Sequence, residues 1–131
     1  MEKNDTLLQA FEWYLPDDSQ HWNKLKVLAP SFSNLGVTLV WLPPAYKGAG
    51  GVHDVGYGVY DLYDLGEFNQ KGTIPTKYGT KQEYLDAIDA LQRENISVLA
   101  DIVLNQKMGG DTEETIDVIK TDPNNRNEEI G

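Results

Sequence analysis

One run, from Ser97 to Gly110, limits most sharply what this chain can fold into. It reads SVLADIVLNQKMGG: aliphatic residues surround Asp101, and a Gly-Gly pair ends the run. An apolar run of this kind is typical of a strand buried on both faces, as in a parallel sheet covered by helices. Asn105 and Gln106 follow the apolar part, so its carboxyl end is a candidate site. A structural aspartate followed by a turn is the alternative.

Strand-like and helix-like segments alternate before this run. The expected elements are, in order, a strand at 6–14, a helix over 22–35, a strand at 37–42, a helix over 80–94 and the strand that begins at Ile96. A connection rich in Gly and Tyr, from Ala45 to Tyr78, separates the two halves, and loops of this length are usually functional. The order predicts an α/β fold with right-handed crossovers. A further short strand is expected at 116–119.

The two expected helices carry different end signals. Thr80 and Glu83 form a T-x-x-E capping box at the start of the second helix. Asp18 or Ser19 is the candidate cap of the first helix, and Gly36 is its natural stop. The apolar stripe that we expect the second helix to bury consists of Tyr84, Leu85, Ile88 and Leu91.

Three parallel strands with their helices form an unfinished sheet. A closed (β/α)8 barrel needs about 250 residues, whereas this chain has 131. An uncovered apolar edge strand pairs readily with another chain. We therefore expect a partner to complete the sheet, either the remainder of a longer barrel or another copy of this chain.

Charge and composition exclude several classes of partner. The chain has 11 Lys and Arg against 21 Asp and Glu, a net charge of −10, which disfavours nucleic acid and anionic membranes. It has no Cys, so it can form neither disulfides nor thiolate metal sites. Its polar N-terminus lacks the apolar region of a secretory signal, and no run is long enough to span a bilayer. We expect a cytoplasmic protein, although a secreted protein whose signal had been removed would look the same.

Aromatic residues and carboxylates suggest a carbohydrate ligand. The aromatic residues of the long connection and the strand ends are Trp13, Trp41, Tyr46, Tyr57, Tyr60 and Tyr63. Sugar rings stack their C–H faces on such rings, and their hydroxyls bond to carboxylates and amides. Packing of the loop is the alternative for each ring, and we favour it for Tyr60 and Tyr63. The candidate carboxylates, among which no pair stands out, are Glu12, Asp54, Asp61, Asp64 and Asp101.

Two further patterns give weaker evidence for a site, one for calcium and one for phosphate. Asp101 and Asn105 could offer oxygens to Ca²⁺, but this ion takes six to eight such ligands, so others would have to complete the site. The glycine-rich segment from Lys47 to Gly51 lacks the spacing of a phosphate-binding loop. We therefore expect it to be a mobile loop tip.

Several segments together resemble the N-terminal third of bacterial α-amylases, in order and at matching spacing. They are FEWY at 11–14, HW at 21–22, VWLPPAYKG at 40–48, DVGYGVYDLYDLGEF at 54–68, QKGTIPTKYGTK at 70–81 and ADIVLNQK at 100–107. The resemblance implies the first three βα units of a (β/α)8 TIM barrel over residues 1–105. It also implies that 106–131 begins the inserted B domain.

The resemblance also implies roles for individual residues. Tyr57 matches a tyrosine that stacks under the sugar next to the scissile bond, and Trp13 lines the glucan cleft. Asp101 matches an aspartate that organises the site, and Asn105 matches a ligand of a structural calcium ion. Gln106 stands where the family has a histidine that hydrogen-bonds the same sugar; glutamine can still donate a hydrogen bond but cannot become cationic.

The family's nucleophile, its acid/base glutamate and its third carboxylate lie on later strands, beyond Gly131. The implied parent hydrolyses internal α-1,4 bonds of starch or glycogen with retention, and this segment alone is expected to be inactive. The alternative function is a non-catalytic module that binds glucan or assembles with copies of itself.

Overall fold

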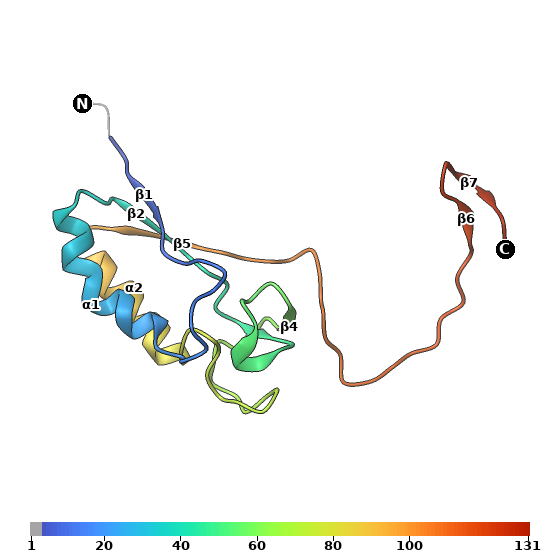
Figure 1. The fold of residues 1–131 in the computed structure, drawn as a ribbon, viewed down its shortest axis with the longest axis horizontal. Helices are drawn as coiled ribbons and strands as arrows, with labels where there is room; N and C mark the ends of the chain where they lie inside the picture. Colours follow the sequence, from blue (N-terminus) through green and yellow to red (C-terminus); the bar gives the residue numbers. More distant parts are fainter. Residues whose placement is uncertain (1–3) are drawn as a thin grey trace.

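The computed structural model describes residues 4–131 and has a parallel sheet as its frame. The sheet has the strand order β1-β2-β5, and two helices, α1 and α2, lie side by side along it (Figure 1). The predicted alternation of strands and helices is therefore confirmed. The elements are β1 (Leu7–Gln9), α1 (His21–Asn34), β2 (Leu39–Leu42), β3 (Lys47–Gly48), the 3₁₀ turn η1 (Gly51–His53), β4 (Val59–Asp61), α2 (Lys81–Arg93), β5 (Ser97–Ala100), β6 (Thr121–Asp122) and β7 (Asn125–Glu129).

The core lies between the sheet and the two helices. β2 is the central strand: Val40 pairs with Leu8 of β1 and with Val98 of β5, and these side chains point toward the helices. Because side chains alternate along a strand, Val40 and Leu42 are fully buried, whereas Leu39 and Trp41 on the other face are not. The buried cluster is completed by Ala10, Trp22, Leu25, Ala29, Ala45, Tyr78, Tyr84, Ala87, Leu91 and Ile96.

The prediction that the 97–110 run is a strand buried on both faces is wrong. β5 ends at Ala100, and only Val98 packs against the core. Leu99 is 43% exposed and Leu104 is 77% exposed. Among the described residues, helices cover only one face of the sheet, and β5 is an edge strand, so the apolar pattern of this run is only partly buried here.

The ends of the helices follow the local sequence. At α2, the hydroxyl of Thr80 accepts the N–H of Glu83 and the Glu83 carboxylate accepts the N–H of Thr80, which confirms the predicted capping box. Gly36, with φ +82°, follows α1 as predicted. The stripe of α2 is confirmed at Tyr84 and Leu91, but Leu85 is exposed.

The predicted cap of α1 is wrong. Gln20 occupies the N-cap position and makes no capping hydrogen bond with its side chain. The Asp18 carboxylate instead accepts the N–H of Gln20, and the Ser19 hydroxyl donates to the carbonyl of Thr76. Ser19 therefore ties the turn before α1 to the end of the long loop, whereas Asp18 also pairs with Lys24 of the helix at 2.7 Å.

A buried ion pair organises the long loop. Lys47 and Asp64 are both fully buried, with 3.4 Å between Nζ and Oδ2. The Lys47 ammonium also donates to the carbonyls of Phe68, Thr73 and Ile74. Segment 47–51 is therefore not the predicted mobile tip, because Lys47 and Gly48 form β3 and pair with β4.

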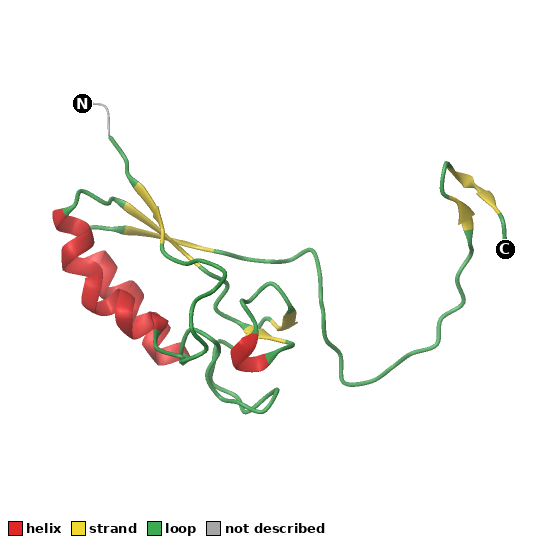
Figure 2. Cartoon of the chain, in the orientation of Figure 1, coloured by secondary structure: helices red, strands yellow, loops and turns green. Residues whose placement is uncertain are grey.

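The last part of the chain leaves the body (Figure 1; Figure 2). Residues 111–120 are exposed and form no strand, so the strand predicted at 116–119 is wrong. β6 and β7 form a hairpin around Pro123 and Asn124, whose turn is fixed by N–H groups donating to the Asp122 carboxylate. Neither strand contacts another described element. Across residues 4–131, the helices are too short or too polar to cross a membrane.

The capping box predicts the cost of removing Thr80. A Thr80→Ala change should lower the free energy of unfolding by about 1 kcal/mol, because the N–H of Glu83 loses its acceptor. Urea unfolding followed by circular dichroism measures this loss. Thr112→Ala, at an exposed position, is the matched control and should change stability by less than about 0.5 kcal/mol; equal losses in both variants would contradict the capping role.

The buried pair predicts acid sensitivity. Burial alone would raise the pKa of Asp64, but the N–H groups of Glu67, Gly66 and Phe68, together with Lys47, outweigh it and hold the pKa below the ordinary 3.8. Protonation therefore favours the unfolded chain, so this contribution is present above pH 3.8 and is lost as the pH falls below it. Urea unfolding at several pH values measures the loss of stability between about pH 5 and about pH 2.5. This loss should be smaller in Asp64→Asn than in the unmodified chain. An unchanged loss would contradict this assignment.

Candidate functional site

A cleft opens where β1 and β2 end. It has a volume of about 440 Å³ and is lined by Gln9, Phe11, Glu12, Trp13, Trp41, Val55, Tyr57 and Tyr78. The two strands bring the 11–13 segment and Trp41 to one edge of the sheet, and the long loop brings Val55, Tyr57 and Tyr78 across to it. The carboxyl edge of a parallel sheet is where α/β folds place their ligands.

Tyr57 and Asp101 meet at this edge, a contact that the sequence analysis did not predict. The Tyr57 hydroxyl donates to Oδ2 of Asp101 over 2.7 Å, and Nε1 of Trp41 donates to the same oxygen over 3.2 Å. Burial, and then the hydrogen bond and charge of Asp101, raise the pKa of Tyr57 well above its usual range. The phenol therefore stays protonated at neutral pH, and it holds the carboxylate by a charge-assisted hydrogen bond.

Trp13 and Tyr57 present parallel rings. Their planes differ by 3° and their centroids lie 6.2 Å apart, while Trp13 is 61% exposed. Phe11 meets Trp41 edge to face at 5.2 Å, which supports the inner wall. A ligand with flat apolar faces and polar edges could therefore lie against the exposed ring of Trp13 while its polar edge reaches Asp101.

Gln106 and Asn105 do not line the cleft. Nε2 of Gln106 donates to the carbonyl of Tyr57 over 3.0 Å, so its amide supports the tyrosine from behind. Asn105 is exposed. Among residues 4–131, no three His, Cys, Asp or Glu side chains gather as metal ligands do. Because calcium takes six to eight oxygens, these residues do not by themselves fit the ion.

Most of the other candidate carboxylates serve the loop. Asp61 accepts the N–H of Tyr63 and the amide of Gln70, and Asp64 is the buried partner of Lys47. Asp54 accepts three backbone N–H groups. Glu12 does line the cleft, and its carboxylate accepts the N–H of Tyr14.

The packing role predicted for two tyrosines is not found. Tyr63 is 87% exposed. Tyr60 donates its hydroxyl to Asp111 over 2.7 Å, and the Lys71 ammonium lies 4.0 Å from the centroid of its ring. Tyr60 therefore tethers the segment that leaves the body instead of filling the core.

Four residues that line the cleft were missed in the sequence, namely Gln9, Phe11, Val55 and Tyr78. Tyr78 is buried, donates its hydroxyl to the carbonyl of Val55, and has a pKa raised chiefly by burial. Phe11 lies two residues before Trp13 in the sequence and packs edge to face on Trp41. The position of Phe11 at the end of an expected strand was a usable signal, whereas the return of Tyr78 to the cleft depends on the folded loop.

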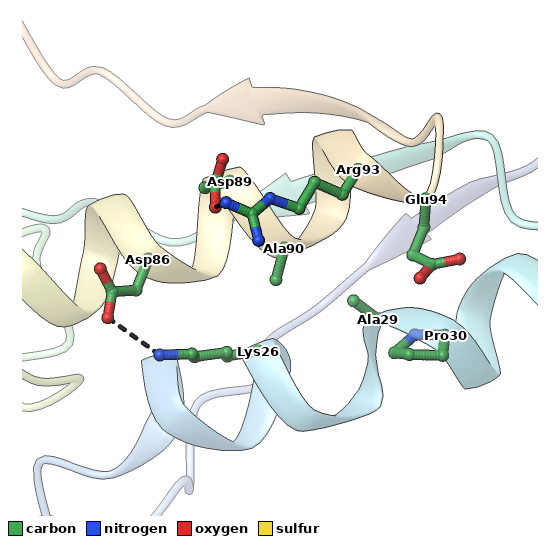
Figure 3. A pocket seen from close by; sticks show the side chains of 8 residues that line it. All are labelled: Lys26, Ala29, Pro30, Asp86, Asp89, Ala90, Arg93 and Glu94. Carbon is green, nitrogen blue, oxygen red and sulfur yellow. Dashed lines mark hydrogen bonds and ion pairs between the residues drawn. The ribbon is translucent and has the colours of Figure 1, made fainter.

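A second hollow, of about 370 Å³, lies between α1 and α2 (Figure 3). Lys26 is paired with Asp86 at 2.9 Å across it, and Arg93 is paired with Asp89 at 2.8 Å. Four of its five charged side chains are thus already paired with one another, Glu94 being the fifth, and no aromatic ring lines it. The cleft beside Trp13 and Tyr57 is the better candidate for a ligand.

Three curated relatives match nearly the whole chain. A glucan 1,4-alpha-maltohexaosidase of Bacillus sp. is 52% identical over 97% of this chain. An alpha-amylase of Geobacillus stearothermophilus is 55% identical over 97%, and the cytoplasmic alpha-amylase of Escherichia coli is 54% identical over 95%. The chain covers only 24%, 23% and 25% of these three proteins, respectively. No protein-family model matches it.

Solved structures of a different enzyme, an alternansucrase, match part of the chain. A truncated alternansucrase of Leuconostoc mesenteroides aligns with a TM-score of 0.65 and 30% identity, over 74% of this chain and 10% of the enzyme. An alternansucrase in complex with isomaltotriose aligns equally well. These matches support a partial α/β domain. By its sequence, this chain is a relative of the bacterial alpha-amylases along nearly its whole length, and it spans about a quarter of theirs.

Proposed function

We propose that this chain supplies one wall of the α-glucan cleft of an alpha-amylase-type glycoside hydrolase. One observation carries the proposal: the exposed ring of Trp13 and the half-buried ring of Tyr57 lie parallel beside Asp101 in a cleft. They do so in a chain that is 52–55% identical to bacterial alpha-amylases and a maltohexaosidase. The parent enzyme would hydrolyse internal α-1,4 bonds of starch or glycogen with retention.

Each residue of the wall has a separate task in this proposal. Tyr57 and Trp13 offer apolar faces to the C–H face of a glucose unit. Asp101 orients the Tyr57 hydroxyl and is a site-organising residue rather than a nucleophile. Gln106 replaces the family's histidine; in the folded chain its amide is used on the Tyr57 carbonyl, so it contributes to substrate binding through Tyr57.

The chemistry itself needs groups from elsewhere. Retaining hydrolysis requires a nucleophilic carboxylate and an acid/base carboxylate about 5–5.5 Å apart on either side of the bond. The resemblance assigns both to later strands, and the carboxylates of the long loop are used for its own N–H groups. The 131-residue chain alone is therefore proposed to be inactive.

The larger architecture is part of the same proposal. Residues 1–105 would form the first three βα units of a (β/α)8 barrel, whose remaining strands would continue the sheet beside β1 and β5. Residues 106–131 would begin the inserted B domain; the exposure of nearly all of 111–131 supports a segment that packs on another part of the protein. Asn105, at the junction, would give one ligand to a calcium ion whose other ligands lie outside these residues. The Escherichia coli relative is named as cytoplasmic, and we propose the same location here.

A second candidate function rests on the uncovered sheet. Leu7 is 54% exposed and Leu99 is 43% exposed on the face that the helices do not cover. In this candidate, a non-catalytic glucan-binding module pairs its free edge with a second copy of the chain, and the joined sheets pack their open faces against each other. Sedimentation of the pure chain separates the two candidates, since this one requires a dimer or larger assembly.

The wall predicts glucan binding that depends on Trp13. Calorimetry with maltoheptaose should detect binding to the 131-residue chain, and Trp13→Ala should weaken it about tenfold or more, about 1.4 kcal/mol. Tyr63→Ala removes an aromatic ring of similar exposure outside the cleft and should leave the affinity unchanged. Equal losses in the two variants, or no binding by the unmodified chain, would contradict the proposed wall.

The missing carboxylates predict an absence of catalysis. The pure 131-residue chain should release no reducing sugar from soluble starch, because it holds neither of the assigned catalytic groups. A complete alpha-amylase at the same molar concentration is the positive control. Hydrolysis by the chain that persists through purification and is lost in Trp13→Ala would show that the assignment of catalysis to later strands is wrong.

A further inference from the structure

We infer that Asp54 is the positioning residue that aims Tyr57 into the cleft. The inference rests on the proposed function, since it concerns how the same wall is built. Oδ1 of Asp54 accepts the N–H of Gly56 over 2.8 Å and the N–H of Gly58 over 3.1 Å. These are the residues on either side of Tyr57, so one carboxylate oxygen holds both of its neighbours.

The other oxygen ties this turn to a second strand. Oδ2 of Asp54 accepts the N–H of Gly50 over 3.2 Å, next to β3. The N–H of Ala49 in turn donates to the carbonyl of Gly58 over 2.7 Å. The backbone of Tyr57 is therefore fixed against the segment that begins at the buried Lys47, rather than held only by its own turn.

Glycines make room for this carboxylate. A Cβ added at Gly48 or at Gly58 would overlap the carboxyl group of Asp54. Gly56 has φ +100°, which favours glycine, and a Cβ there would come within 2.7 Å of Pro44. Gly48 and Gly58 thus leave the space that the Asp54 carboxylate occupies, and Asp54 has the geometry of a built support.

What Asp54 supports is the set of contacts made by Tyr57. The ring of Tyr57 lies parallel to that of Trp13, its hydroxyl donates to Asp101, and its carbonyl accepts from Gln106. All three contacts depend on where the Tyr57 backbone lies. Asp54 itself does not line the cleft, so its effect on a ligand would pass through Tyr57.

Three tryptophans allow a test that needs no ligand. The indole N–H resonance of Trp13 senses the ring of Tyr57, while that of Trp22 reports on the core, where the ring is fully buried. Asp54→Ala should shift the Trp13 resonance in the same direction as Tyr57→Ala does and leave Trp22 in place. Asp54→Asn keeps the oxygen that accepts from Gly56 and Gly58, and should leave Trp13 near its original position.

Binding gives the second readout. Asp54→Ala should weaken maltoheptaose binding about tenfold, Asp54→Asn should stay within about twofold, and Asp54→Ala should add nothing further in a Tyr57→Ala background. Asp61→Ala removes another carboxylate that serves the same loop and is the matched control. If the unmodified chain binds no maltoheptaose, the proposed function fails, whereas the Trp13 resonance still decides the inference about Asp54.

An unmoved Trp13 resonance in Asp54→Ala, with Trp22 unchanged, would overturn the inference. If Asp54→Ala does not fold, Gly58→Ala takes its place, since the added methyl group displaces the carboxylate without removing its charge. Loss of the Trp22 resonance in both variants would show that Asp54 maintains the whole fold rather than Tyr57, and would also overturn it.

Discussion

The buried contact between Lys47 and Asp64 is the interaction on which the cleft depends. Both side chains lie fully out of solvent, where an unpaired charge would be costly. Each is satisfied by several backbone groups in addition to its partner: Lys47 by three carbonyls and Asp64 by three N–H groups. This pair closes a loop of irregular backbone, and the closed loop delivers Tyr57 and Tyr78 to the edge of the sheet.

Local signals were readable because they act over a few residues. The capping box of Thr80 and the stop at Gly36 depend on neighbouring backbone groups alone, and both were predicted. The carboxyl end of the sheet was predicted as the place of a site because α/β folds place their ligands there, but the pairing of Tyr57 with Asp101 was not predicted. Its hydrogen bond of 2.7 Å is a property of the fold that sequence spacing does not contain.

The errors share a different physical origin. Lys47 in a glycine-rich segment was expected at a mobile tip, because a lone lysine gives no sign of a partner that lies 17 positions along the chain at Asp64. The 97–110 run was expected to be buried because its composition is that of a two-sided strand. Burial, however, depends on neighbours, and the described residues provide helices on one face only.

The proposed binding of a glucan and its proposed hydrolysis make different demands on the fold. Stacking on Trp13 and Tyr57 requires only that the sheet edge and its loop be in place, and residues within 4–131 hold both. Hydrolysis requires two carboxylates facing each other across the bond, and therefore a second wall. Calcium poses the same problem, because six to eight ligands cannot come from one exposed amide at Asn105. The proposed binding and the proposed catalysis therefore need different parts of such an enzyme, and the described residues hold only the aromatic cleft of the first.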